Sequence, residues 1–303
     1  MATVGAAAQG MSVWRAWWLA ARPRTLPVSA APVLVGTALA LADGRARALP
    51  AAAALAGALL LQIGANFAND LFDFEKGADT DARLGPARAV QQGLLTPEQM
   101  RAGTAAAFGG AFAVGIYLAA VGGWPVVAIG LLSIAAGVAY TGGPYPLGYH
   151  GLGDVTVFLF FGVVAVCGTY YVQALTLEPA ALAASFPVGA LAAAILVVNN
   201  VRDIETDAAA GKRTLAVRLG RRASRAQYAA LLLLPYALPP AAHLLLGAGP
   251  GIYLPILTLP AALRLIRTVA TREDGLSLNE ALAGSAQLEL GYSVLLALGW
   301  VLT

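Results

Sequence analysis

Nine stretches of this 303-residue chain are apolar over about 20 residues each, and short polar segments separate them. An α-helix needs about 20 apolar residues to cross a bilayer, where a helix or closed barrel must satisfy every backbone polar group. The sequence therefore predicts an all-α polytopic membrane protein. We expect its transmembrane helices at about 26–42, 49–72, 99–121, 124–140, 153–174, 180–202, 224–247, 252–270 and 278–302.

The composition agrees with a membrane protein and excludes several other classes. Charged residues make up 12% of the chain, against about 25% in a typical soluble domain. A single cysteine, Cys167, excludes a disulfide framework and a thiolate metal site. The chain contains no basic run of the kind that binds nucleic acid, so we expect no nucleic-acid partner.

The start of the chain differs from the apolar remainder. Residues 1–10 lack the charged start of a signal peptide. The segment after them mixes tryptophans with arginines: Trp14, Trp17 and Trp18 with Arg15, Arg22 and Arg24. Such a mixture is typical of a helix that lies on the bilayer surface. We therefore predict a disordered start and an interfacial helix over residues 1–21, followed by one transmembrane domain over residues 22–303.

The distribution of basic residues predicts the orientation. If the N-terminus is cytoplasmic, 17 of the 19 lysines and arginines border cytoplasmic segments, and only Arg45 and Arg47 lie on the other side. Basic residues favour the cytoplasmic side of a membrane. We expect a multi-pass protein of the cell's inner, cytoplasmic membrane.

The second predicted span ends in an unusual concentration of negative charge. Five acidic residues, from Asp70 to Asp81, fall within twelve positions. The spacing Asn-x-x-x-Asp occurs here twice, at 66/70 and 69/73, and again at the end of the sixth span, at 199/203, with Asp207 four residues further. Residues four apart share a helix face. The repetition suggests two related helical halves that each bring carboxylates, over about 66–88 and 199–213, to one shared site.

Carboxylates that face one another require a cation, and hard oxygen ligands favour Mg²⁺, which substrate phosphate oxygens often complete. Lysines and arginines follow both motifs, and these cations would neutralise the rest of a diphosphate. Charged residues at helix ends are more often only solvated, but two clusters of equal spacing on one side favour a site. A secondary transporter is the alternative from another class, although transporters usually bind ligands near the bilayer midplane.

Four segments resemble the UbiA superfamily of intramembrane prenyltransferases: "RPRTLPVSAAPVLVGTALA" (22–40), "NFANDLFDFEKGADTDARLGPARAVQQGLLT" (66–96), "YTGGPYPLGYHGLGD" (140–154) and "NNVRDIETDAAAGKRTLAVRLG" (199–220). The resemblance implies a nine-helix bundle around a central cavity and Mg²⁺-dependent transfer of a polyprenyl group to an aromatic ring. The third carboxylate of the superfamily's first motif would fall at Gly77, and Asp79 is the nearest substitute.

Within the superfamily, the segments most resemble the branch that prenylates 1,4-dihydroxy-2-naphthoate for menaquinone synthesis. The reaction so implied joins a polyprenyl group from polyprenyl diphosphate to that ring, with loss of CO₂ and diphosphate, and gives demethylmenaquinone. Another aromatic acceptor is the alternative within the superfamily. Neither prenyl chain length nor oligomeric state follows from the sequence.

The predicted site residues fall into three groups. Catalytic candidates are Asn69, Asp73, Asp203, Asp207 and Tyr140; metal ligands are Asp70, Asp73, Asp79, Asp203 and Asp207; substrate-binding candidates are Asn66, Arg22, Arg24, Lys76, Arg83, Asn199, Arg202, Lys212 and Arg213. Arg22 and Arg24 are candidates for the acceptor's carboxylate. Glu289, within the ninth span, is expected to pair with Arg264 across the bundle.

Overall fold

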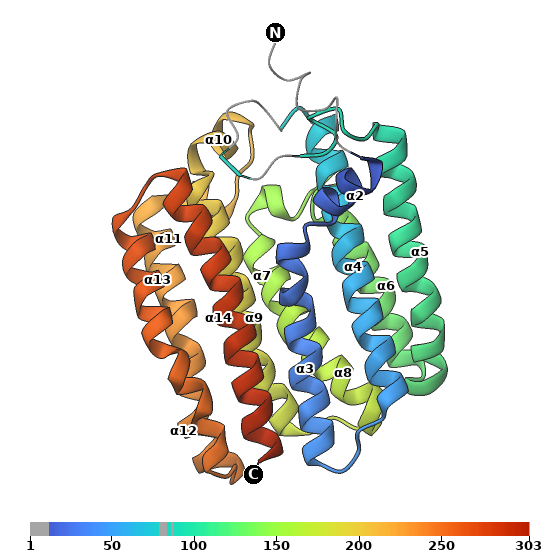
Figure 1. Cartoon of the computed structure of the whole chain (residues 1–303), viewed down its shortest axis with the longest axis vertical. Coiled ribbons are helices and arrows are strands. Elements are labelled where there is room, and N and C mark those ends of the chain that lie inside the picture. The colour runs from blue at the N-terminus through green and yellow to red at the C-terminus, as the bar shows by residue number, and fades with distance from the viewer. Residues whose placement is uncertain (1–11, 79–83, 86–87, 303) are drawn as a thin grey trace.

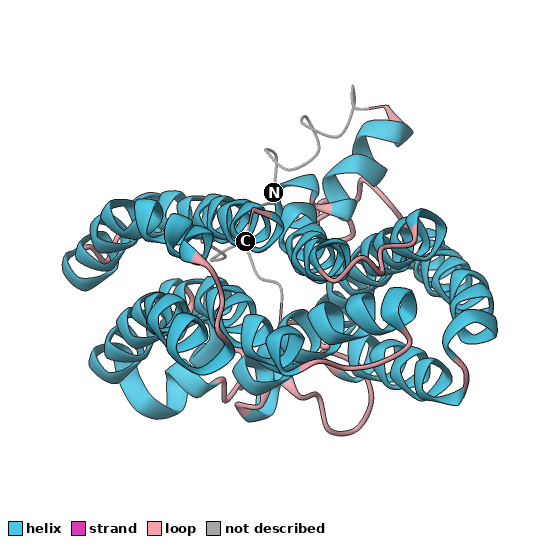
Figure 2. Cartoon of the chain, turned by 90° about the horizontal axis from the view of Figure 1, so that it is seen from below, coloured by secondary structure: helices cyan, strands magenta, loops and turns pink. Residues whose placement is uncertain are grey.

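The computed structural model describes residues 12–78, 84–85 and 88–302, and this part of the chain contains helices and no strand (Figures 1 and 2). Its main helices are α2 (Val13–Ala21), α3 (Leu26–Ala42), α4 (Ala48–Glu75), α5 (Pro97–Gly122), α6 (Trp124–Ala139), α7 (Gly153–Val157), α8 (Ala165–Ala174), α9 (Pro179–Arg202), α10 (Ile204–Ala209), α11 (Leu215–Leu233), α12 (Leu238–Leu246), α13 (Leu259–Thr271) and α14 (Gly275–Val301). Short 3₁₀ segments η1 (Pro23–Thr25), η2 (Gly148–His150), η4 (Leu234–Ala237) and η5 (Pro250–Thr258), and the π-helix η3 (Phe158–Val164), join them.

The predicted membrane architecture is confirmed. Eight helical stretches in the described part are long and apolar enough to cross a bilayer, and α6 is a shorter apolar helix between the third and the fourth of them. Together they follow the order of the nine predicted spans. The chain is therefore a multi-pass membrane protein whose helices stand side by side in one bundle (Figure 1).

Several spans that the apolar pattern presents as one helix consist of two or more pieces. The fifth is built from α7, η3 and α8, and the seventh from α11, η4 and α12. The π-helix lies where the fifth span crosses α9, and a Cβ atom added at Gly162 would come within 2.6 Å of the Gly189 Cα. Hydropathy does not register such a change of helix type, because every residue around the crossing is apolar or small.

α9 lies in the most enclosed part of the bundle, and most of its apolar residues are buried inside the protein. Its small side chains allow α3, α11 and α14 to pack closely against it, as expected for helices in lipid. Glu289 in α14 is fully buried, and neither carboxyl oxygen has a hydrogen-bond partner among the described residues. The expected pair with Arg264 is wrong, because Arg264 faces outward.

The elements that carry the predicted site meet at one end of the bundle. α10 and α2 lie at this end, and the C-terminus lies at the other (Figure 1). α2 exposes Trp14 and Trp18 and is fixed to the bundle by Trp17, whose ring packs edge-on against Phe67 at a centroid distance of 5.3 Å. The orientation of this end relative to the cytoplasm stays a prediction.

Candidate active site

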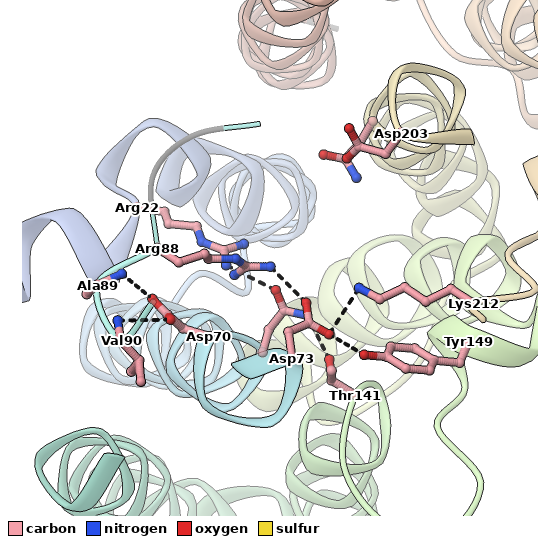
Figure 3. A network of polar contacts seen from close by, with 12 residues as sticks. Arg22, Asp70, Asp73, Arg88, Ala89, Val90, Thr141, Tyr149, Asp203 and Lys212 are labelled. Carbon is pink, nitrogen blue, oxygen red and sulfur yellow. Dashed lines mark hydrogen bonds and ion pairs between the residues drawn. The ribbon is translucent and has the colours of Figure 1, made fainter. Parts of the chain in front are cut away.

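Asp73, near the end of α4, is the centre of a polar network at this end of the bundle (Figure 3). Its side chain is 1% exposed and accepts an ion-pair hydrogen bond at each oxygen, from Arg88 at 2.9 Å and from Lys212 at 3.1 Å. Lys212 follows the second acidic motif, 139 residues further along the chain. The two motif regions therefore do meet, through an aspartate of one and a lysine of the other.

Tyr149, on the loop between α6 and α7, also contacts this aspartate. Its hydroxyl donates a hydrogen bond to Asp73 Oδ1 at 2.5 Å, and the Nζ atoms of Lys76 and Lys212 lie 4.9 and 4.8 Å from its ring centroid. An ammonium group within about 6 Å of an aromatic centroid is attracted by the ring's negative face. Three separate loops are thus connected through one side chain.

A second chain of hydrogen bonds runs beside Asp73. Arg22 donates to Asn69 Oδ1 at 3.0 Å, and the amide group of Asn69 donates to the Thr141 hydroxyl at 2.8 Å. Lys76 donates to the Thr141 carbonyl at 2.5 Å. Arg22 itself lies in the left-handed region, with φ of 51°, a conformation that non-glycine residues adopt at a cost of about 1 kcal/mol or more. The turn between α2 and η1 thus directs this guanidinium toward α4.

Asp70 has a different environment from the one the spacing suggests. It is 1% exposed, and its two oxygens accept hydrogen bonds from the backbone N–H groups of Ala89 and Val90, at 2.9 and 3.3 Å. These bonds fix the chain next to Arg88, the residue that pairs with Asp73. The geometry assigns Asp70 a part in holding this segment, which does not follow from an Asn-x-x-x-Asp spacing.

The second motif is held by a buried arginine. Arg202, fully buried at the end of α9, donates to both oxygens of Asp203 at 2.8 and 2.5 Å and to Asn199 Oδ1 at 2.9 Å. It also donates to Asn279 of α14 at 2.6 Å. Because its N–H groups donate to Asn199, Asp203 and Asn279, the Arg202 guanidinium holds the second motif in a fixed orientation against α14. Figure 3 shows Asp203 on a separate helix, apart from the Asp73 network.

The remaining predicted residues are placed as follows. Asn66 donates to the Ala21 carbonyl at 3.0 Å and thereby holds the N-terminal segment. Arg24 and Arg213 are exposed, and the Arg213 backbone N–H donates to the Tyr149 carbonyl at 2.8 Å. Asp207 is half-buried on α10. Asp79 and Arg83 lie outside the described residues, so their predicted roles stay predictions.

Tyr140, which follows α6, lies close to several acidic groups. Burial, and then the negative charges of Asp154, Asp73 and Asp207, raise the pKa of this phenol above its usual value. A tyrosine phenol is protonated at neutral pH in any case, and this environment disfavours its ionisation further, so the oxygen can donate a hydrogen bond. A phenol in this position can stabilise a bound group without carrying charge.

Oxygen donors of the kind that hold Mg²⁺ are present in both motifs. Asp73 and Asp203 supply carboxylates, and Asn69 and Asn199 supply amide oxygens. No group of three or more acidic, histidine or cysteine side chains is gathered close enough to hold a metal within the described part of the chain. Lysine and arginine instead neutralise the carboxylates. The donor set fits a hard divalent cation that is completed by substrate oxygens.

Three residues of the network do not follow from the sequence patterns. They are Tyr149, Thr141 and Asn279, and each contacts a motif residue from a segment distant in sequence. Tyr149 and Thr141 belong to the polar segment 140–154 between two apolar spans, which marks them as loop residues but not as partners of Asp73. Asn279 is a polar residue near the start of the last span, and nothing else in the sequence indicates that it contacts Arg202.

Comparisons with known proteins agree on the family. The family model described as "UbiA prenyltransferase family" matches residues 29–282. A Haemophilus influenzae protein named 1,4-dihydroxy-2-naphthoate octaprenyltransferase is 36% identical over 93% of this chain and 94% of its own length. A Mycobacterium tuberculosis protein of the same name is 41% identical over 88% of this chain and 89% of its own length.

Solved structures share the fold. A UbiA homolog from Archaeoglobus fulgidus, bound to GPP and Mg²⁺, aligns with a TM-score of 0.66 at 17% identity, over 93% of this chain and 99% of its own. The apo structure of a UbiA homolog from Aeropyrum pernix K1 aligns with a TM-score of 0.68 at 17% identity, over 93% and 98%. The predicted resemblance is confirmed: the chain belongs to the UbiA prenyltransferase family and is a membrane-embedded prenyltransferase.

Proposed function

We propose that this enzyme transfers a polyprenyl group from polyprenyl diphosphate to 1,4-dihydroxy-2-naphthoate, in menaquinone biosynthesis. The relatives above, which cover nearly the whole chain, bear the name of this reaction. The observation that carries the site assignment is the convergence of Arg88 and Lys212 on Asp73, because it joins cations and a carboxylate from both motif regions. A diphosphate ester requires both kinds of group.

The residues present would hold Mg²⁺ through Asp73 and Asp203, with Asp207 and Asp79 as further candidates. When bound, Mg²⁺ would withdraw charge from the departing diphosphate. Binding of the donor would shift Lys212 and Arg88 from Asp73 to the diphosphate oxygens, while Arg202 keeps the second motif oriented. Lys76 is the third cation within reach of this point. Such fixed charges stabilise the leaving group most as it departs.

In the proposed reaction the bond between the first prenyl carbon and the diphosphate oxygen breaks, and the electron pair stays on oxygen. The ring carbon that bears the acceptor's carboxylate forms the new C–C bond. Loss of CO₂ returns the electron pair of the ring–carboxylate bond and restores the aromatic ring. The Tyr140 phenol and Arg22, beside Asn69, are our candidates for contacts with the acceptor. The apolar bundle excludes water, which would hydrolyse an allylic cation.

The orientation belongs to the same proposal. The site lies at the end of the bundle where the basic residues of the N-terminal segment and of α11 gather. We propose that this end faces the cytoplasm, across the cell's inner membrane. A water-soluble acceptor would then enter from the cytoplasm and the prenyl donor from the lipid.

The test is product formation by the purified protein. Polyprenyl diphosphate and 1,4-dihydroxy-2-naphthoate labelled in the carboxylate are expected to give demethylmenaquinol, the reduced form of demethylmenaquinone, and one labelled CO₂ for each diphosphate released. Homogentisate in place of the naphthoate is expected to give no product. Prenylated homogentisate, with no turnover of the naphthoate, would refute the acceptor assignment but leave the enzyme class.

A further inference from the structure

Tyr149 lies where three loops meet, and the chemistry proposed above gives it no part. Its hydroxyl contacts Asp73 at the end of α4, and its carbonyl accepts a hydrogen bond at 2.8 Å from the Arg213 backbone N–H, beyond α10. Its own loop, residues 140–152, contains no lysine or arginine. The loop nevertheless lies beside two ammonium groups, because Lys76 and Lys212 come to the Tyr149 ring from the segments that follow α4 and α10.

The ammonium groups of Lys76 and Lys212 both lie close to the Tyr149 ring, and their like charges repel each other. Other contacts must therefore offset this repulsion if both groups are to stay there. Desolvation lowers the pKa of Lys76, the negative charge of Asp73 partly opposes this, and the positive charge of Lys212 lowers the pKa further. The ring of Tyr149 attracts both Nζ atoms, which lie 4.9 and 4.8 Å from its centroid. The hydrogen bond from the Arg213 backbone N–H to the Tyr149 carbonyl holds the loop that carries the ring, and the Tyr149 hydroxyl also donates to Asp73 Oδ1.

We infer that Tyr149 is a positioning residue that holds Lys76 and Lys212 side by side, so that both ammonium groups bind the same donor diphosphate. A diphosphate carries several negative oxygens, so it gains from two cations that are already adjacent. The ring does not compete for this ligand, because its face carries no hydrogen-bond donor or acceptor. This inference rests on the proposed function, since the ligand is the leaving group of that reaction.

The test separates the ring from the hydroxyl. Binding of inorganic diphosphate with Mg²⁺ to the purified full-length protein is measured by titration calorimetry, and the KM and kcat for the prenyl donor are measured in parallel. Tyr149→Leu removes the ring, and we expect about tenfold weaker diphosphate binding and a matching rise in the donor's KM. Tyr149→Phe keeps the ring, and we expect binding within about threefold of the wild type.

Tyr145 supplies the matched control. It lies four residues earlier in the same loop and is exposed, and its ring stacks on His150 at a centroid distance of 3.7 Å. Tyr145→Leu is expected to bind diphosphate as the wild type does. A double-mutant cycle adds a second readout: Lys76→Met is expected to weaken binding in the wild type and to weaken it much less in Tyr149→Leu, because the second lysine is no longer held.

The outcomes distinguish the two proposals. Wild-type affinity in Tyr149→Leu, or a loss in Tyr149→Phe as large as that in Tyr149→Leu, overturns the positioning role of the ring while the enzyme reaction stands. Failure of the wild-type protein to bind diphosphate overturns the proposed function, and the inference with it. Thermal unfolding of each variant checks the fold, and Tyr149→Phe keeps the ring packing even if the leucine variant does not fold.

Discussion

A substitution at Asp70 tests whether its carboxylate is a metal ligand or a structural group that holds the segment around Arg88. Its two oxygens accept hydrogen bonds from the backbone N–H groups of Ala89 and Val90, at 2.9 and 3.3 Å, and Asp70 is only 1% exposed. In Asp70→Asn, one of these oxygens becomes an NH₂ group that faces another donor. One buried N–H therefore loses its acceptor, and Arg88 loses part of its support.

The expected cost follows from that geometry. Leaving a buried donor without a partner costs about 1–3 kcal/mol, and each 1.4 kcal/mol is about tenfold in an equilibrium constant. If the segment opens locally, amide hydrogen exchange at Ala89 and Val90 accelerates by about 5- to 150-fold. Exchange followed by mass spectrometry on a peptide over residues 88–95 measures this directly, without substrate or metal.

Glu75→Gln is the matched control, since it changes a carboxylate to an amide on the same helix. Glu75 pairs with Arg101 on α5, and among the described residues no hydrogen bond or ion pair joins it to the segment 88–95. We expect its exchange over 88–95 to equal that of the wild type. Unchanged exchange in Asp70→Asn, together with loss of Mg²⁺-dependent activity as complete as in Asp73→Asn, would refute the structural role and return Asp70 to the metal ligands.

Three further changes test the packing of the bundle by thermal unfolding in detergent. Glu289→Leu removes a buried carboxyl whose oxygens have no hydrogen-bond partner among the described residues. We therefore expect the free energy of unfolding to rise by about 1–3 kcal/mol, and a lower unfolding midpoint would contradict this. Arg202→Met leaves Asp203 buried beside α9 without its cation, and we expect a loss of about 3–5 kcal/mol; an unchanged midpoint would contradict this. Gly162→Ala places a Cβ atom 2.6 Å from the backbone of α9, whereas the same change at Gly109 meets nothing within 4 Å. We expect a loss of about 1–3 kcal/mol for the first and little change for the second, and equal midpoints would refute the close crossing.

The spans were predictable because hydropathy over 20 residues reports directly whether a helix can lie in lipid. All nine predicted spans coincide with apolar helical stretches of the described chain. Helix type was not predictable in the same way. The π-helix at Phe158–Val164 depends on how closely α9 approaches it, and that distance is a property of two segments together.

For the candidate site, the sequence indicates the two motifs but not the side chains that contact them. Spacing selected Asp73 and Asp203 near the ends of two helices, and equal spacing selected Asp70, whose oxygens accept hydrogen bonds from the backbone N–H groups of Ala89 and Val90. A periodic pattern gives the face of a helix and not the group that lies opposite. Tyr149 was missed for the same reason, since its contact with Asp73 spans 76 residues.

The central claim is that Asp73 and Asp203, from the two halves of the chain, act on one Mg²⁺-bound donor. The most direct measurement is the Mg²⁺-dependent rate of prenyl transfer by the purified wild type, Asp73→Asn and Asp203→Asn. Asp43→Asn is the control, because Asp43 lies after α3, away from both motifs, and accepts a hydrogen bond from Tyr170. We predict that both motif variants lose activity on the order of 100-fold or more, while Asp43→Asn keeps the wild-type rate. Wild-type turnover by either motif variant, or equal turnover without any divalent cation, would contradict the claim.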